Sequence, residues 1–165
     1  MKNKEYIILE IIPTSSNPEK GSIIQLSALK LKELTLIDRF DYRLNEKYLP
    51  IKEMKSWIDY DKSSFTYVDS DKIILEEFSK WSNNLLILII DNIYTPLYLK
   101  NLSNKLEYIY DYLDTEYSTN LIDDIIVKYH LTNSNYIVDL LYEALIYHYK
   151  WYIFLVKILQ YKTNI

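Results

Sequence analysis

Acidic side chains beside apolar segments are the residues of this sequence that could do chemistry. Glu10 interrupts the first apolar stretch of the chain, and Asp91 directly follows a later one. Asp139 and Glu143 both fall in the last segment with helical periodicity. Carboxylate oxygens are the ligands that Mg²⁺ and Mn²⁺ favour, and a bound divalent ion can activate water for attack on a phosphodiester. Together these acids could form a metal site.

Composition excludes several other chemistries. The chain has 165 residues and no Cys, which rules out disulfides, thiolate metal sites and cysteine nucleophiles. Its single Gly excludes glycine-rich phosphate loops. His130 follows a predicted helix, where a cation suits the helix dipole. His148 lies among aromatic residues with no second His or suitably spaced acid, so we expect neither histidine to be a ligand.

Apolar periodicity divides the chain into the elements that must position these acids. Segments with β-branched residues or alternating polarity predict strands, and apolar positions at helical spacing predict helices. Residues 45–71 are expected to form a long polar connection. The predicted strands are 5–12, 22–32, 35–44 and 85–90, and the predicted helices are 72–81 (capped by Asp71), 95–106, 121–129 and 136–160.

The order β-β-β-α-β-α-α-α predicts the fold. Three meander strands, followed by a helix that crosses to a further strand, are the layout of the ribonuclease H-like fold. This is an α/β fold whose mixed sheet joins three antiparallel strands to parallel ones and is flanked by helices. The chain shows no internal repeat or low-complexity linker, so residues 1–165 are expected to form a single domain.

Four segments, taken in order, resemble the motifs of DnaQ-like 3′–5′ exonucleases. The stretch from Tyr6 to Leu31 is similar to that family's opening strand, turn and second strand, and residues 49–81 resemble its connection into the first helix. Residues 85–99 (LLILIIDNIYTPLYL) are similar to the second motif, and residues 120–145 resemble the closing segment. The likeness covers nearly the whole chain and implies an exonuclease-like domain of the ribonuclease H-like fold.

The resemblance also implies where catalytic ligands would stand. In the family, carboxylates hold a pair of divalent ions that drive phosphodiester cleavage. Glu10 occupies the first acidic position, one methylene longer than the family's Asp, and Asp91 stands where the family has His. The other acidic positions hold Ile12, Pro96 and Leu141, and the general-base position falls near Tyr136. The resemblance therefore implies a vestigial site with no metal or other cofactor, in a domain that binds but does not cut.

Two other interpretations stay open. In one, the site is rearranged and the protein is an active metal-dependent 3′–5′ exonuclease that uses Mg²⁺ or Mn²⁺, held by Glu10, Asp91 and Asp139 or Glu143. Against it, Asp91 can cap the helix that follows, and Glu143 can belong to a solvated stripe. In the other, the resemblance misleads and the chain is an unrelated α/β interaction protein, which a sheet without three antiparallel strands would indicate.

Charge and aromatic content indicate the class of partner. The net charge is −4, and residues 107–143 carry eight acidic residues against Lys128 alone, a local charge of −7. Proteins that grip phosphates usually show a basic stripe, so nucleic acid is not favoured as a partner. We expect a protein partner or a second copy on the aromatic part of the last helix, formed by Tyr147, Tyr149, Trp151, Tyr152 and Phe154.

Two features bear on location. Glu143, Lys150 and Lys157 place a polar stripe along the last predicted helix, which argues against a membrane span. The first apolar run is too short for a signal-peptide core. We therefore expect a cytoplasmic protein without a membrane segment.

Overall fold

The computed structural model describes residues 5–33, 35–48, 65–89 and 93–109, together with 138, 139, 141, 142, 145 and 146. The chain divides into two compact units, Met1–Ile109 and Tyr110–Ile165. The expectation that residues 1–165 form one domain stays a prediction.

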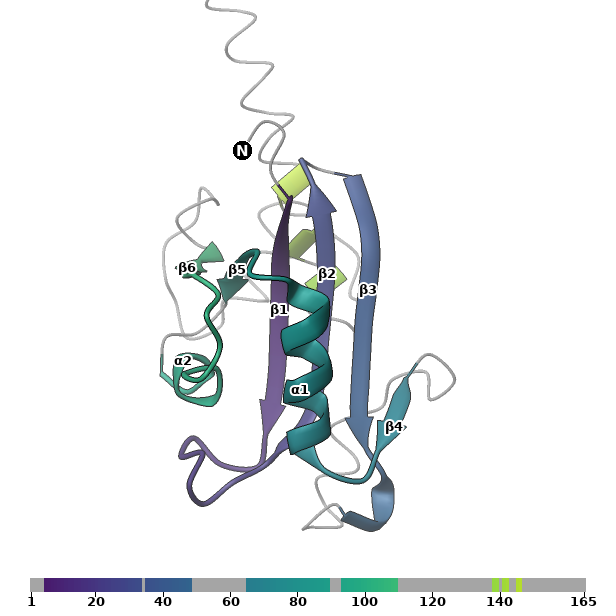
Figure 1. The fold of residues 1–165 in the computed structure, drawn as a ribbon, viewed down its shortest axis with the longest axis vertical. Coiled ribbons are helices and arrows are strands. Elements are labelled where there is room, and N and C mark those ends of the chain that lie inside the picture. Colours follow the sequence, from purple (N-terminus) through teal and green to yellow (C-terminus); the bar gives the residue numbers. More distant parts are fainter. Residues whose placement is uncertain are drawn as a thin grey trace, which may run out of the picture. The chain divides into compact units, whose positions relative to one another are not determined.

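A mixed sheet of six strands forms the first unit (Figure 1). The strand order is β4-β3-β2-β1-β5-β6. The first three strands pair antiparallel, while β4, β5 and β6 each pair parallel with their neighbours. This is a ribonuclease H-like α/β fold, as the sequence predicts. The strands are β1 (Glu5–Pro13), β2 (Ile23–Lys32), β3 (Thr35–Leu44), β4 (Thr66–Val68), β5 (Leu86–Ile89) and β6 (Leu106–Tyr108).

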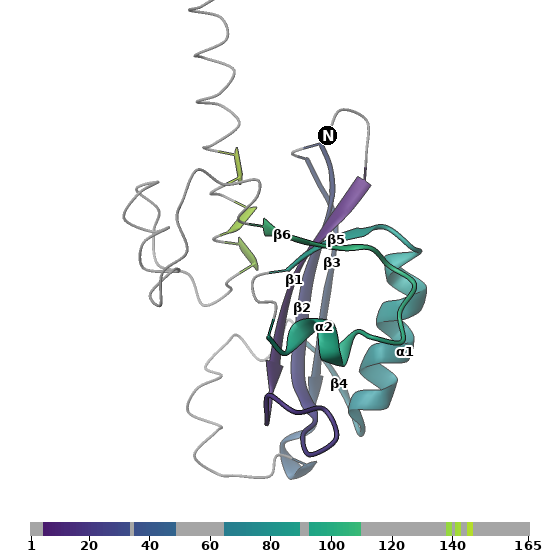
Figure 2. The ribbon, with the colours of Figure 1, turned by 90° about the vertical axis from the view of Figure 1, so that its left-hand side faces the viewer.

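One face of the sheet packs against α1 (Asp71–Ser82), as the view in Figure 2 shows. Ser70 caps this helix by accepting a hydrogen bond from the Ile73 amide at 3.4 Å. Ile74 and Phe78, one helical turn apart, are fully buried against the sheet. The helix ends at Asn83, whose φ of 45° lies in the left-handed region that commonly terminates helices.

The strand β1 is buried on both faces of the sheet. Its alternate residues Ile7, Leu9 and Ile11 belong to the core that α1 covers. The residues between them point to the opposite face, because successive side chains of a strand alternate. Tyr6 and Ile8 on that second face are also buried. A strand paired on both sides and covered on both faces explains why the segment is almost continuously apolar.

The structure corrects three sequence predictions in the first unit. The cap of α1 is Ser70 rather than Asp71, which is the first helical residue. The connection at 45–71 is not wholly irregular, since it contains a short 3₁₀ helix (Glu46–Tyr48) and β4, whose Thr-Tyr-Val sequence suits a strand.

The third correction concerns the predicted helix at 95–106. The helix α2 (Thr95–Tyr98) ends after a single turn, and β6 follows it. The polar residues after α2 favour side chain to backbone bonds over helix continuation. Asn104, for example, donates from Nδ2 to the Leu85 carbonyl at 2.8 Å.

The described residues of the second unit are helical. Within the part of the chain that the structure describes, Val138, Leu141 and Leu145 are buried, and their spacing places them along one helix face. They fall inside the predicted helix 136–160, whose ends lie outside the described residues, as does the whole predicted helix 121–129. Among the described residues, no helix is long and apolar enough to cross a membrane.

Candidate functional site

The most informative acid is Glu10, near the C-terminal end of β1. Glu10 and Ile12 are two residues apart on one strand, so both point to the sheet face opposite α1. Glu10 is only 5 % exposed, whereas Ile12 is half-buried. The structure thus places an acid and an aliphatic side chain together at the two positions where the resemblance implies a pair of metal-binding acids.

A buried polar cluster surrounds Glu10 on this face of the sheet. Strand register aligns Glu10 with Ser27 of β2, and Ser27 with Asp41 of β3. The next row on the same face aligns Ile12 with Gln25, and Gln25 with Arg43. We call Glu10, Gln25, Ser27, Asp41 and Arg43 the polar cluster; in all of them the side chain is nearly or fully buried.

One cationic group lies within the polar cluster and another beside it. Arg43 is 2 % exposed and its guanidinium lies 5.7 Å from the centre of the Phe65 ring. Arg39, which shares the strand face of Asp41 and Arg43, pairs through Nε with Asp41 Oδ2 at 3.1 Å. Gln25 donates from Nε2 to Ser27 Oγ at 3.2 Å. Buried carboxylates need such partners, because isolated buried charge is strongly unfavourable.

Sequence reasoning missed every member of this cluster except Glu10. The reason is that residues 35–44 were interpreted as a half-buried strand, whose polar side chains are expected to face solvent. The signal that could have found them is the alternation Arg39, Asp41, Arg43, which sets opposite charges side by side on one strand face.

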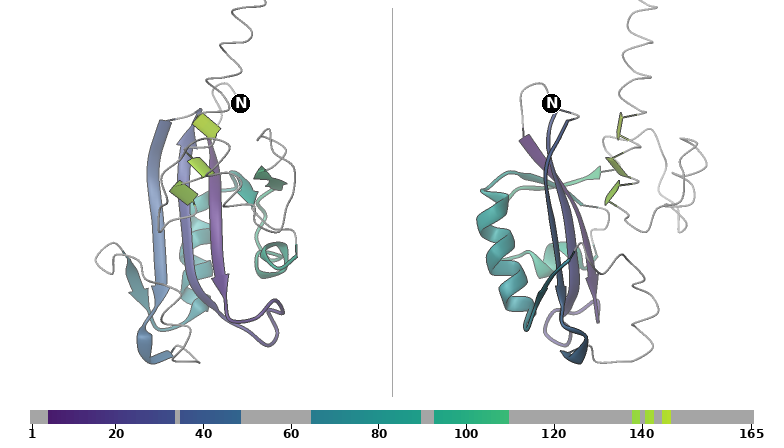
Figure 3. Two further views of the ribbon diagram at one scale, coloured as in Figure 1. Left: turned by 180° about the vertical axis from the view of Figure 1, so that it is seen from behind. Right: turned by 90° about the vertical axis from the view of Figure 1, so that its right-hand side faces the viewer.

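The other predicted site residues are divided between the two units and the part of the chain outside the described residues. Pro96 is half-buried in α2, which lies beside β1 on the β5–β6 side of the sheet (Figure 1; Figure 3, left). In the second unit, Leu141 is fully buried and Asp139 is half-buried. Asp91, Tyr136 and Glu143 lie outside the described residues, as do the aromatic residues proposed as a partner surface. Among described residues, no group of three or more His, Asp or Glu side chains could hold a metal ion.

The loop that follows β1 is tied to α2, and the start of β2 just beyond it is tied to α1. Tyr98 of α2 donates its hydroxyl to the Ser15 carbonyl at 2.7 Å, and Asp71 of α1 accepts from the Ile23 amide at 3.1 Å. Burial, and secondarily the Asp71 charge, raise the pKa of the Tyr98 phenol above 10.0. A Cβ on Gly21 would lie 2.6 Å from the Tyr98 hydroxyl, so a larger residue there would force its neighbours to shift. These contacts hold the chain immediately beyond Ile12 in one conformation.

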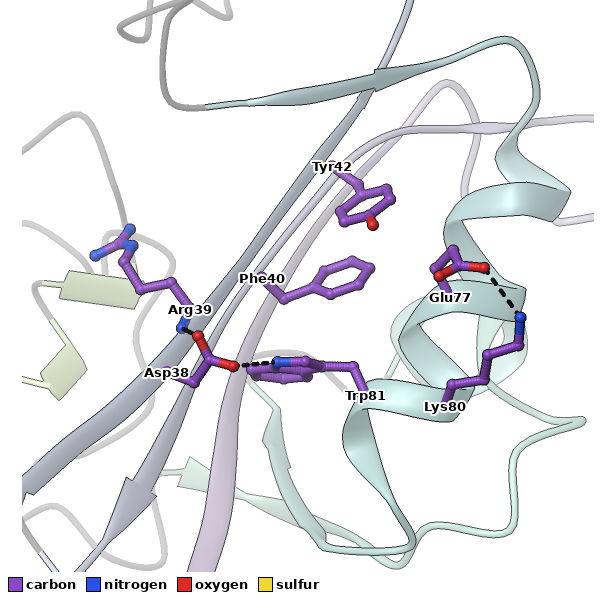
Figure 4. A pocket seen from close by; sticks show the side chains of 7 residues that line it. All are labelled: Asp38, Arg39, Phe40, Tyr42, Glu77, Lys80 and Trp81. Atoms are coloured by element: carbon purple, nitrogen blue, oxygen red, sulfur yellow. Dashed lines mark hydrogen bonds and ion pairs between the residues drawn. The ribbon is translucent and has the colours of Figure 1, made fainter.

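A groove lies between β3 and α1, on the sheet face that α1 covers and opposite the polar cluster (Figure 4). Its volume is about 410 Å³. The rings of Phe40 and Tyr42 stack at 4.1 Å, and Phe40 lies 5.4 Å from Trp81. The groove is lined by Asp38, Arg39, Phe40, Tyr42, Glu77, Lys80 and Trp81.

The fold is similar to that of solved structures of exonuclease I. Two solved structures of exonuclease I, one with bound product and one with the inhibitor BCBP, superpose on this chain with TM-scores of 0.56 and 0.54. Each is 10 % identical in sequence, and the matches cover 88 % and 89 % of this chain but only 42 % and 41 % of exonuclease I. No family sequence profile matches the chain, and no characterised protein matches it by sequence.

Proposed function

We propose that this chain is a catalytically inactive, exonuclease-like domain that acts as a binding or interaction module. The fold supports an exonuclease ancestry. The residue types at the former ligand positions support the loss of cleavage, because the aliphatic side chains of Ile12 and Leu141 and the imino acid Pro96 offer no metal ligand. A pair of divalent ions could not be held by the carboxylate of Glu10 alone.

The observation that carries the proposal is the environment of Glu10. A catalytic carboxylate must reach a hydrated metal and a phosphodiester, and this one is 5 % exposed within a polar cluster. The cations built into the same sheet face are Arg39 and Arg43, whose guanidinium groups repel a divalent metal. Glu10 therefore acts in this proposal as a structural acid of the buried sheet face.

The alternative is an active nuclease with a rearranged site of Glu10, Asp91 and Asp139 or Glu143 that requires Mg²⁺ or Mn²⁺. One observation favours it. The strand β5 pairs parallel with β1, so a residue that directly follows β5 belongs to the same end of the sheet as the C-terminal part of β1. In the sequence Asp91 is the second residue after β5, which is the reason to test it together with Glu10.

The deciding experiment combines metal binding with cleavage. The protein is titrated calorimetrically with Mn²⁺, and labelled single-stranded DNA and RNA are incubated with it in the same buffer. The variants are the Glu10→Gln, Asp91→Asn double substitution and Glu19→Gln, a matched control on an exposed loop. The inactive-domain proposal expects no millimolar Mn²⁺ binding and intact substrates for every protein. Cleavage by wild type and Glu19→Gln, lost in the double variant, would establish the rearranged site instead.

Partner and location complete the proposal. The net charge of −4 supports a protein partner over nucleic acid. The aromatic residues between Tyr147 and Phe154 remain our candidate surface for a partner or a second copy. A cytoplasmic location is also proposed, as is the absence of any cofactor.

A further inference from the structure

The outer edge of β3 is only partly covered by another strand. The short strand β4 pairs with residues 42–44 alone (Figure 1). The edge formed by residues 35–41 therefore has no partner strand among the described residues. Residues 35–39 are exposed, and they include two large apolar side chains, Leu36 at 36 % and Ile37 at 47 %. An exposed edge with apolar residues is a template on which another strand can pair.

The direction of the backbone amides along this edge follows from the pairing with β4. In a strand, the amides of alternate residues point to the same edge. The Asn45 amide, directly after β3, donates to the Val68 carbonyl of β4 at 2.9 Å. The amides of Arg43, Asp41 and Arg39 therefore point to this outer edge as well. Arg39 and Asp41 precede the residues that β4 pairs with, so an added strand would have to bond to them.

The Asp38 carboxylate already occupies one of these two amides. Its Oδ1 accepts a hydrogen bond from the Arg39 amide at 2.8 Å, and its Oδ2 accepts one from the Trp81 indole at 2.9 Å (Figure 4). Trp81 belongs to α1, and its ring lies 5.4 Å from that of the buried Phe40, so the indole holds the carboxylate from a packed position. A strand that approached the edge would have to exchange this charged acceptor for a neutral carbonyl, which is the weaker acceptor.

The ladder between β2 and β3 is irregular just before Asp38. Lys30 aligns with Asp38 and Leu31 aligns with Leu36, so Ile37 is an extra residue on the β3 side. Such a bulge bends the strand and interrupts the regular spacing of amides and carbonyls that an added strand needs. The bulge obstructs the part of the edge that comes before Asp38, and the Asp38 carboxylate obstructs the part between the bulge and β4.

We infer that Asp38, anchored by Trp81, blocks strand addition at the β3 edge and so prevents two copies of the chain from joining their sheets there. A second copy is the strand to be excluded, because every copy carries the same exposed edge and two such edges can pair antiparallel about a two-fold axis. The inference holds whether or not the domain cleaves nucleic acid. It also implies that a partner of the proposed binding module is not received by the main chain of β3.

The test measures hydrogen exchange of the backbone amides in the full, isotope-labelled chain at micromolar and millimolar concentration, with sedimentation velocity on the same samples. Asp38→Val removes the acceptor and introduces a β-branched residue that suits a strand. We expect this variant to associate as its concentration rises, and its Arg39 and Asp41 amides to exchange at least about threefold more slowly in the concentrated sample. Wild type should show no concentration dependence at these two amides.

Matched variants separate the carboxylate from other effects of substitution. Thr35→Val adds a β-branched apolar residue to the exposed part of the same strand and leaves Asp38 in place, so it should behave as wild type. Asp38→Asn removes the charge but keeps an oxygen that can accept from the Arg39 amide, so it should associate less than Asp38→Val. Trp81→Phe keeps a ring but removes the donor that anchors Asp38. It should speed exchange of the Arg39 amide in the dilute sample, and it decides the test if Asp38→Val does not fold.

Several outcomes would overturn the inference. Slower exchange at Arg39 and Asp41 in concentrated wild type would show that the edge is already open. Equal association of Asp38→Val and Thr35→Val would assign the effect to added apolar surface. Association of Asp38→Val without slower exchange at these amides would place the contact elsewhere on the chain. Wild-type exchange and sedimentation in both folded Asp38→Val and Trp81→Phe would show that the carboxylate blocks nothing.

Discussion

Tyr98 donates a hydrogen bond to the backbone carbonyl of Ser15, at 2.7 Å, across most of the first unit's sequence. This bond ties α2 to the loop that leaves β1. The loop begins after Pro13, the last residue of β1, so its conformation determines which residues lie at the end of the strand that carries Glu10. The conformation of this end of the sheet therefore depends on the Tyr98 hydroxyl. The chain has 18 Tyr residues, and the sequence pattern does not single out Tyr98 among them.

Tyr98→Phe should lower the free energy of unfolding by about 1–2 kcal/mol, because the Ser15 carbonyl loses its donor while the ring stays in place. Urea unfolding followed by circular dichroism measures this as a lower midpoint. Tyr48→Phe removes a hydroxyl from a residue that is 46 % exposed and should leave the midpoint unchanged. Equal midpoints for wild type and Tyr98→Phe would show that the bond contributes nothing.

Stability at alkaline pH should depend on the same residue. Because burial and Asp71 raise the pKa of Tyr98 in the folded state, the folded protein holds this proton more tightly than the unfolded chain does. The resulting stabilisation is fully present below the unfolded pKa of 10.0 and is lost as pH rises through the higher folded pKa. The difference in unfolding free energy between wild type and Tyr98→Phe should therefore shrink above pH 10.0. A difference that stays constant or grows there would contradict the sign.

Gly21→Ala should destabilise the protein by about 1–3 kcal/mol, because the new methyl group would meet the Tyr98 hydroxyl and the Ser15 Cβ at contact distances that force a shift. In the Tyr98→Phe background one of these obstacles is gone. The same substitution should then cost less, and a double-mutant cycle measures the coupling. Ser16→Ala, at an exposed position of the same loop, serves as the control and should change little. Strictly additive costs would show that the two residues do not constrain each other.

The predictable part of the fold consists of elements long enough to show a pattern. β-branched and alternating residues predicted β1, β2, β3 and β5, and apolar spacing predicted α1 to within a residue or two at each end. β4 and β6 have three residues each, too few for any periodicity. Such short strands form because a neighbouring strand edge is available, which is a tertiary condition that local sequence does not contain.

The candidate site was predictable only along a single strand. The alternation of side chains already places Glu10 and Ile12 on one face of β1. The polar cluster depends instead on register, which aligns Glu10 with Ser27 and Ser27 with Asp41 across three strands. Its burial depends on what covers that face, and a strand's own sequence cannot specify this.

The ion pair between Arg39 and Asp41, a member of the polar cluster, yields the last prediction. Asp41 has a side-chain exposure of 7 % and Arg39 one of 35 %, so the carboxylate is the more desolvated partner of their ion pair. Asp41→Asn should lower the free energy of unfolding by about 1–3 kcal/mol, since it removes a buried charge from beside guanidinium groups. Arg39→Gln should cost less, because solvent can reach the guanidinium it replaces.

Combining Asp41→Asn with Arg39→Gln distinguishes a specific pair from general loss of packing. If the two side chains stabilise each other, the double variant should cost less than the sum of the single variants, with a coupling of about 0.5–2 kcal/mol. The side chains of Lys72 and Glu76 are 83 % and 57 % exposed and form a surface ion pair. The substitutions Lys72→Gln and Glu76→Gln should therefore show almost no coupling in the same urea measurement. Coupling in the surface pair as large as in the Arg39–Asp41 pair would mean that burial adds nothing to the ion pair.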